Sequence, residues 1–114
     1  MVSLQSLSPI EHQTIQKERA RVLIANGSQD EGAGNKLKKI LTNDRFIVVN
    51  VQQADHPYLA TQIENFNPQT ANTGLILGQL FGVLASTQST APPHGGDIIL
   101  ILGQDSATSV EATG

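Results

Sequence analysis

Arg21-Val22-Leu23-Ile24-Ala25-Asn26-Gly27-Ser28 is the stretch of sequence that decides the fold. Its β-branched and apolar residues predict a strand, and the Asn-Gly pair predicts the turn that ends this strand. The strand is apolar on both faces, which is typical of a strand inside a sheet that is covered on at least one side. We expect a helix to follow over residues 32–43, because Leu37, Ile40 and Leu41 recur there with helical spacing.

Three more strands and one more helix are predicted downstream. Residues 46–51 are rich in β-branched residues, residues 60–66 alternate apolar with polar side chains, and residues 97–102 repeat the aliphatic pattern of the first strand. Pro68 favours the first turn of a helix over residues 69–84. The order β-α-β-β-α-β predicts the α/β class, a two-layer sandwich of a four-stranded sheet with two helices on one face, ferredoxin-like or similar. We expect the first strand in the middle, beside the third or the fourth strand.

The 114 residues have room for one domain. We expect a folded unit over residues 20–105, an N-terminal tail or linker over 1–19 and a C-terminal tail over 106–114. A short helix over 11–19 is the one element that the first tail could hold. Residues 86–96 are predicted to form a flexible loop, because Ser, Thr, Pro and Gly dominate them.

The composition excludes several classes of protein. The chain has no Cys, so it has no disulfide framework, no thiolate metal site and no thiol nucleophile. Its 7 Lys+Arg stand against 10 Asp+Glu, and only 4% of its residues are aromatic, so we expect no nucleic-acid partner. No stretch has the roughly 20 apolar residues that span a bilayer, and the first residues lack the pattern of a signal peptide. The chain as given is therefore expected to be soluble, and only an anchor upstream of it could hold it at a membrane.

The Gly-rich turn over residues 26–34 lies between a strand and a helix, where phosphate-binding loops occur. Its spacing matches neither the dinucleotide nor the P-loop motif. Asp30 and Glu31 would also repel an anion at the start of the helix. The sequence favours a tight turn, and we expect no cofactor.

An acid–base site is suggested by Asp55 and His56 beside Tyr58. A small hydrolase that uses Asp55, His56 and Asp105 is one hypothesis. A solvated turn is favoured, because adjacent turn residues point apart and His56 precedes a proline.

The other two histidines, His12 and His94, fall in the expected tail and loop, so we expect no metal site.

Two further patterns each allow two interpretations. Lys36, Lys38, Lys39 and Arg45 could bind an anionic polymer, although the water-facing side of an amphipathic helix is favoured. Glycines recur every four residues at Gly74, Gly78 and Gly82. They favour close packing of that helix against the sheet, and self-association through the glycines is the alternative.

Several of these motifs occur together in one family. The chain resembles the C-terminal domain of the LytR–CpsA–Psr cell-wall family over about residues 20–105. The resemblance rests on residues 22–28, Gly32 at the start of a helix, residues 46–49, the sequence Phe-Asn-Pro at 66–68, and the closing strand with its Leu-Gly-x-Asp ending at 102–105. Ala33 and Gly34 replace the usual Leu-Ala. Arg45 replaces the usual glycine, so a left-handed backbone is either not required at this position or strained.

The resemblance implies a non-catalytic accessory domain on the extracytoplasmic face of the bacterial membrane. The glycopolymer transfer of the family belongs to a larger, Arg-rich domain, so we do not expect it here. A cell-wall glycopolymer or an envelope protein is the expected partner, and a weak homo-oligomer is possible. The residues of the structural motif are Asn26, Gly27, Gly32, Gly103 and Asp105. The candidate binding residues are Asn26, Gly27, Ser28, Lys36 and Lys39. The candidate contact surface is the turn over residues 26–34 with the exposed face of the second pair of strands.

Overall fold

The computed structural model describes residues 7–88 and 96–113. All six predicted elements are present, and so is the short helix that residues 11–19 could hold. A C-terminal helix and a short strand are added to them. In chain order the elements are α1 (Pro9–Glu18), β1 (Arg21–Asn26), α2 (Ala33–Asn43), β2 (Ile47–Gln53), β3 (Gln62–Asn65), the 3₁₀ turn η1 (Pro68–Thr70), α3 (Ala71–Phe81), β4 (Ser86–Thr87), β5 (Ile98–Leu102) and α4 (Gln104–Thr113).

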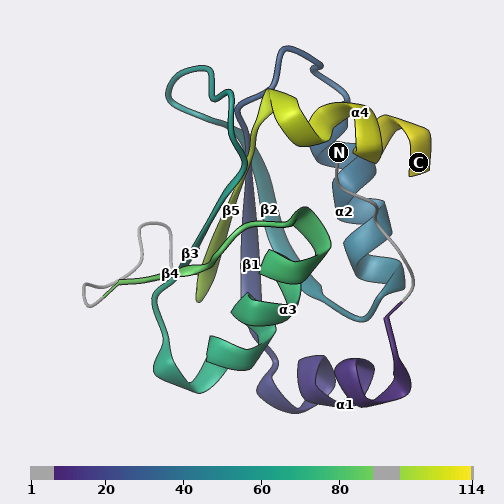
Figure 1. Cartoon of the computed structure of the whole chain (residues 1–114), viewed down its shortest axis with the longest axis vertical. Coiled ribbons are helices and arrows are strands. Elements are labelled where there is room, and N and C mark those ends of the chain that lie inside the picture. The colour runs from purple at the N-terminus through teal and green to yellow at the C-terminus, as the bar shows by residue number, and fades with distance from the viewer. Residues whose placement is uncertain (1–6, 89–95, 114) are drawn as a thin grey trace.

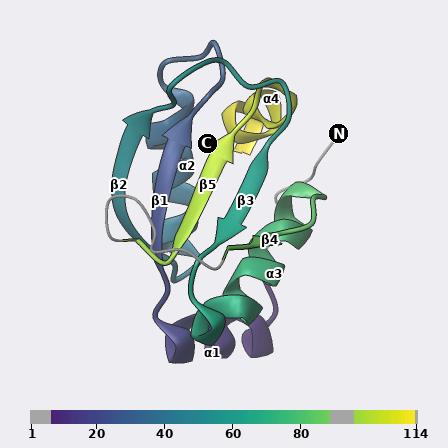
Figure 2. The same ribbon diagram turned by 90° about the vertical axis from the view of Figure 1, so that its left-hand side faces the viewer.

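The strands form one mixed sheet in the order β2-β1-β5-β3-β4. β1 is parallel to β2 and to β5, and β5 is antiparallel to β3. The helices lie to one side of the sheet (Figure 1), and the opposite face, turned toward the viewer in Figure 2, has no helix over it. The α/β class and the one-sided helix layer are therefore confirmed.

Two details of the predicted sheet are wrong. The sheet has five strands and not four, because Ser86 and Thr87, predicted within a loop, pair with β3. β1 and β2 are direct neighbours, so the first β-α-β unit is not the split unit of a ferredoxin-like sheet. β1 does lie beside the last predicted strand, β5, which is one of the two neighbours that we expected.

The core fills the space between the sheet and the helices. Its largest fully buried side chains include Phe81, Ile24, Leu37, Leu41 and Leu100. A second, smaller cluster lies on the helix-free face, where Leu23, Ala25, Ile99 and Ile101 pack against Ala54, Tyr58 and Phe66. This second cluster explains why β1 and β5 are apolar on both of their faces.

The two predicted tails are in fact helices where the structure describes them. α1 begins with a capping box between Ser8 and Glu11, and it buries Ile15 against the core. α4 packs against α2, and its Val110 is completely buried. Each helix has low amphipathicity and few large apolar residues, so the sequence pattern of neither was strong enough to predict a packed helix.

The glycine stripe of α3 packs inside the chain. The helix ends at Phe81, three residues before the end predicted at Leu84, and Gly82 caps it with a left-handed φ of 68°. A Cβ at Gly78 would lie 2.5 Å from the carbonyl oxygen of Val83, so the returning chain needs a glycine there. Close packing is thus the better interpretation of the stripe. Within residues 7–88 and 96–113, no helix is long and apolar enough to cross a bilayer.

Arg45, which stands where the resembled family has a glycine, has a strained left-handed backbone. Its φ is 78°, and the chain turns here from α2 into the strand that begins near Phe46. An arginine in this left-handed region is strained, because its Cβ crowds the backbone. Phe46 is 3% exposed, and its burial in the core fixes the turn despite the strain.

Candidate binding site

The turn after β1 holds two of the predicted binding residues in the interior. Asn26 is 3% exposed and Ser28 is 6% exposed. Asn26 Oδ1 accepts hydrogen bonds from the backbone N–H of Ser28 at 3.1 Å and from its hydroxyl at 2.7 Å, and Asn26 Nδ2 donates to the carbonyl of Asp30 at 2.8 Å. These bonds shape the turn and use most of the polar groups of both side chains. A role of the two residues in binding stays a prediction.

Gly27 joins this turn to the loop between β2 and β3. Its N–H donates to the carbonyl of Leu102 at 2.8 Å, and its carbonyl accepts from the N–H of Tyr58 at 2.9 Å. A Cβ at Gly27 would lie 2.7 Å from Tyr58 Cδ1 and 3.1 Å from the Leu102 carbonyl oxygen. Only glycine lets the three segments come this close.

Gly103 and Asp105 hold the same loop from the other side. The N–H of Gly103 donates to Thr61 Oγ1 at 3.0 Å. Asp105 Oδ1 accepts from the N–H of Thr61 at 3.0 Å and from its hydroxyl at 2.8 Å, and the N–H of Asp105 donates to the Leu59 carbonyl at 3.0 Å. The Leu-Gly-x-Asp ending therefore anchors the loop over residues 54–61 to the end of β5.

Gly32 has no such steric requirement. It precedes α2 with a φ of −85°, which any residue adopts. A Cβ there would meet only Asp30 Oδ1, at the ordinary contact distance of 3.6 Å. The structure therefore explains four of the five motif residues, but not why Gly32 should be a glycine.

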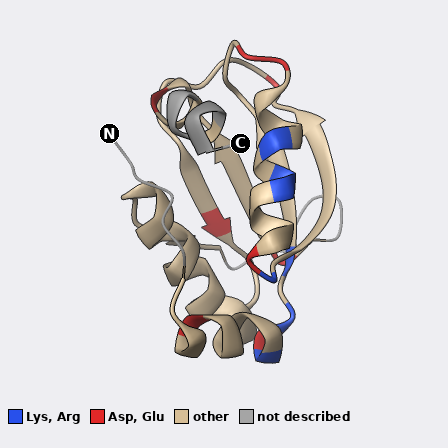
Figure 3. Cartoon of the chain, turned by 90° about the vertical axis from the view of Figure 1, so that its right-hand side faces the viewer, with Lys and Arg blue, Asp and Glu red and all other residues tan. Residues whose placement is uncertain are grey.

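The two candidate lysines lie apart from the buried turn. Lys36 is half-buried and Lys39 is exposed. Figure 3 shows the Lys residues of α2 in blue along the helix. Lys39 lines a shallow concavity with Asn35, Lys38, Thr42 and Asn43. The structure does not gather Lys36, Lys39 and the turn around one cavity, so their common role in binding stays a prediction.

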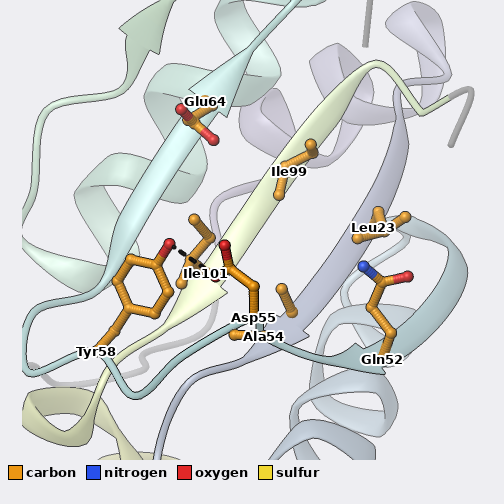
Figure 4. Close-up of a pocket in the computed structure, with 9 residues that line it drawn as sticks. Leu23, Gln52, Ala54, Asp55, Tyr58, Glu64, Ile99 and Ile101 are labelled. Atoms are coloured by element: carbon orange, nitrogen blue, oxygen red, sulfur yellow. Dashed lines mark hydrogen bonds between the residues drawn. The ribbon is translucent and has the colours of Figure 1, made fainter. Parts of the chain in front are cut away.

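A groove lies on the helix-free face, beneath the loop over residues 54–61 (Figure 4). Its volume is about 240 Å³, and its floor is formed by apolar side chains of β1 and β5. The loop and the neighbouring strands supply a phenol, two carboxylates and an amide around this floor. The lining residues are Leu23, Ala25, Gln52, Ala54, Asp55, Tyr58, Glu64, Ile99 and Ile101.

The polar groups of the groove act on one another. The hydroxyl of Tyr58 donates to Asp55 Oδ1 at 3.3 Å, and the ring of Tyr58 stacks on His56 with 4.2 Å between centroids. Loss of solvent around the phenol raises the pKa of Tyr58, and the negative charges of Asp55 and Glu64 raise it further. Two carboxylates therefore lie where the apolar floor of the groove meets the loop, and among the described residues no Lys or Arg lines the groove beside them.

The hydrolase residues are not assembled into a catalytic site. His56 Nε2 lies 3.7 Å from Asp55 Oδ1, but the two side chains are 59% and 79% exposed. Asp105 Oδ1 instead accepts two hydrogen bonds from Thr61. This arrangement lacks the nucleophile and the enclosed cavity that acid–base catalysis would need.

The histidines do not gather around a metal site in the described part of the chain. His12 Nε2 lies 3.7 Å from Asp44 Oδ1, and His56 belongs to the loop beside the groove. His94 lies outside the described residues. Among residues 7–88 and 96–113, no group of three or more His, Asp or Glu side chains could hold a metal ion.

Sequence reasoning missed the groove as a unit. It singled out Asp55 and Tyr58 as parts of an acid–base site and the face of two strands as a contact surface, but not Gln52 or Glu64. One signal was available, because a sheet with helices on one face needs apolar residues on only that face. Four apolar residues lie on the other face, which no helix covers, and they indicate a second apolar surface there: Leu23, Ala25, Ile99 and Ile101.

A possible surface for self-association is the outer edge of β2. β2 is the first strand in the sheet order, and Ile47 and Val49 on it are 43% and 47% exposed. An apolar edge strand can pair with another chain. The homo-oligomer nevertheless stays a prediction.

The comparisons with known proteins agree with this fold. A sequence model described as "LytR cell envelope-related transcriptional attenuator" matches residues 19–105. The solution structure of the C-terminal domain of RV0431 is similar, with a TM-score of 0.53 and 21% sequence identity, over 90% of this chain and 80% of that one. No curated protein matches the sequence. Because the matched range spans most of its length, the chain belongs to the LytR C-terminal domain family of cell-envelope proteins.

Proposed function

We propose that this chain is a non-catalytic accessory domain that binds the cell wall, and that it does so with the groove on its helix-free face. The ligand that we propose is peptidoglycan, a polymer of sugars and short peptides. The observation that carries the proposal is the groove itself, in which an apolar floor lies beside the phenol of Tyr58 and the carboxylates of Asp55 and Glu64. Ligand sites commonly combine such a floor with a few polar groups around it.

The charge of the groove favours peptidoglycan over an anionic glycopolymer. Among the described residues that line the groove, none is Lys or Arg. Arg21 starts β1 on the same face, but its Nε lies 3.4 Å from Asp97 Oδ2. An anionic polymer would meet Asp55 and Glu64 without a compensating cation, whereas an uncharged or amine-bearing polymer would not be repelled.

The loop that forms one wall is held firmly enough to act as part of a site. Gly27 anchors it at Tyr58, and Gly103 and Asp105 anchor it near Thr61. A wall fixed at both ends loses little conformational entropy when a ligand binds. The family's motif residues thus support the groove from beneath and need not contact a ligand.

Cosedimentation with insoluble peptidoglycan sacculi tests the proposal. Gln52→Trp fills the groove with a large side chain, and we expect it to reduce the sedimented fraction at least fivefold. Gln53→Trp is the matched control, because Gln53 is exposed on the same strand, alternates in face with Gln52 and does not line the groove. The proposal fails if the unmodified chain stays in the supernatant, or if both variants, folded by circular dichroism, sediment like it.

A further inference from the structure

We propose that the groove recognises an aliphatic primary ammonium group, carried by the peptides of the cell wall. This inference rests on the proposed function and names the part of peptidoglycan that enters the site. The apolar floor takes the methylene chain, and the carboxylates of Asp55 and Glu64 take the ammonium group.

The size of the groove favours a side chain over a sugar. Its volume of about 240 Å³ is below the range of roughly 300–1,000 Å³ that is typical of pockets for drug-sized ligands. A disaccharide is larger than such a pocket can hold, but a chain of three or four methylene groups fits it. We therefore infer that a single side chain enters and that the rest of the polymer lies outside.

The floor supplies the apolar half of the recognition. Leu23 is 1% exposed, and Ile99 and Ile101 are 7% and 8% exposed, so the floor offers a narrow apolar strip, wide enough for a single methylene chain. Ile99 and Ile101 are alternate residues of β5 and point to the same face. Methylene groups that lie on this surface would leave water while their charged end stays at the rim, as lysine side chains do elsewhere.

The two carboxylates supply the charged half, and they come from different elements. Asp55 lies in the loop, and Glu64 projects from β3, where it is paired across the sheet with Ile99 (Figure 4). Within the described residues, neither has a Lys or Arg within 4.0 Å, and the exposed His56 is the one ion-pair partner of Asp55. An ammonium group has three donors, so it can bond to one of these carboxylates while the charge of the other adds to the attraction.

The environment of Tyr58 shows that both carboxylates act at the wall of the groove. Loss of solvent comes first among the causes that raise the pKa of Tyr58, and Asp55 and Glu64 both add to it. Both carboxylates therefore act on the phenol at the groove wall. A cation bound there would lower the pKa of Tyr58, and an anion would raise it further.

The experiment compares sacculi before and after acetylation of their free amino groups. We expect acetylation to weaken binding of the unmodified chain about tenfold, and raising the salt concentration to weaken it before acetylation but not after. Asp55→Asn and Glu64→Gln should each weaken binding to untreated sacculi about two- to fivefold, and the double variant about tenfold. Glu31→Gln is the matched control, because Glu31 is exposed and does not line the groove.

A soluble probe separates the two proposals. Nα-acetyl-lysine amide should shift the NMR signals of Ile99 and Ile101, and its Nε-acetylated form should not. Equal binding to acetylated and untreated sacculi would overturn the ammonium inference and leave the proposed function intact. Absence of any effect of the lysine probe would also overturn it. If the probe shifts these signals but sacculi do not bind, the ammonium chemistry of the groove is supported, while peptidoglycan is wrong as its source.

Discussion

The carboxylate of Asp105 accepts two hydrogen bonds from Thr61, a residue 44 positions earlier in the chain. Thr61 is 3% exposed, so its backbone N–H has no access to water. The hydroxyl of Thr61, which donates to Asp105, also accepts a hydrogen bond from the N–H of Gly103. One threonine therefore couples the first turn of α4 to the loop that walls the groove.

Replacement of Asp105 should destabilise the protein. Asp105→Ala leaves the buried N–H of Thr61 without a partner, and we expect it to lower the free energy of unfolding by about 1–3 kcal/mol. Asp105→Asn keeps an acceptor oxygen and should lose roughly half as much. Urea unfolding followed by circular dichroism measures both. An Asp105→Ala variant as stable as the unmodified chain would contradict this role of the carboxylate.

Gly103 should be far less tolerant of a side chain than Gly32, although both are glycines of the family motif. A Cβ at Gly103 would overlap the backbone of Ala60 and Thr61, which cannot move away cheaply. We expect Gly103→Ala to cost more than about 2 kcal/mol. Gly32→Ala should change the free energy of unfolding by less than about 0.5 kcal/mol, because its Cβ makes only an ordinary contact, 3.6 Å from Asp30 Oδ1. Equal thermal unfolding midpoints for the two variants would refute this distinction.

Arg45→Gly should stabilise the protein. Glycine adopts a φ of 78° without the crowding that an arginine suffers, and this gain exceeds the greater flexibility that glycine adds to the unfolded chain. We expect a gain of about 0.5–1 kcal/mol in the free energy of unfolding. Arg45→Ala keeps the strain and removes the charge, so it should give no gain. If alanine stabilises as much as glycine, the charge of Arg45 and not its backbone is the cause.

Tyr58 should titrate above its ordinary pKa of about 10. It is the one tyrosine of a chain without tryptophan, so the ultraviolet absorbance of tyrosinate reports on this residue alone. Loss of solvent is the largest cause of the raised pKa of Tyr58. The negative charge of Asp55 and its hydrogen bond to the phenol raise this pKa further. Asp55→Asn should therefore move the titration to lower pH, whereas Glu31→Gln should not. A midpoint that is unchanged by Asp55→Asn would show that the phenol does not sense the groove carboxylate.

The central strands and the helices between them could be predicted because each has a strong local pattern. The aliphatic run over residues 21–25 and the helical spacing of Leu37 and Leu41 need no tertiary information. α4 could not be predicted in this way, since Val110 becomes a core residue only when α2 lies beside it. The groove was hidden for a similar reason. Its parts come from β1, β2, β3, β5 and a loop, and only the order of strands in the sheet brings them together.

Asp97 should make the protein less stable in acid. Partial burial alone would raise its pKa, but hydrogen bonds from the backbone of Arg21, from Asn67 and from the guanidinium of Arg21 outweigh burial and lower it. The folded state thus favours the charged carboxylate. The contribution of Asp97 to the free energy of unfolding is complete above the pKa of about 3.9 that the carboxyl has in the unfolded chain. This contribution is lost as the pH falls through the lower pKa that the carboxyl has in the folded state.

Urea unfolding between pH 7 and pH 2.5 measures this loss. Asp97→Asn removes the titrating group, so the stability difference between the unmodified chain and this variant should shrink as the pH falls below about 4. Asp105→Asn lacks a different carboxylate and serves as the comparison, because Asp97 still titrates in that variant. A difference between the unmodified chain and Asp97→Asn that stays constant down to pH 2.5 would mean that the Arg21 and Asn67 hydrogen bonds do not favour the ionised form of Asp97.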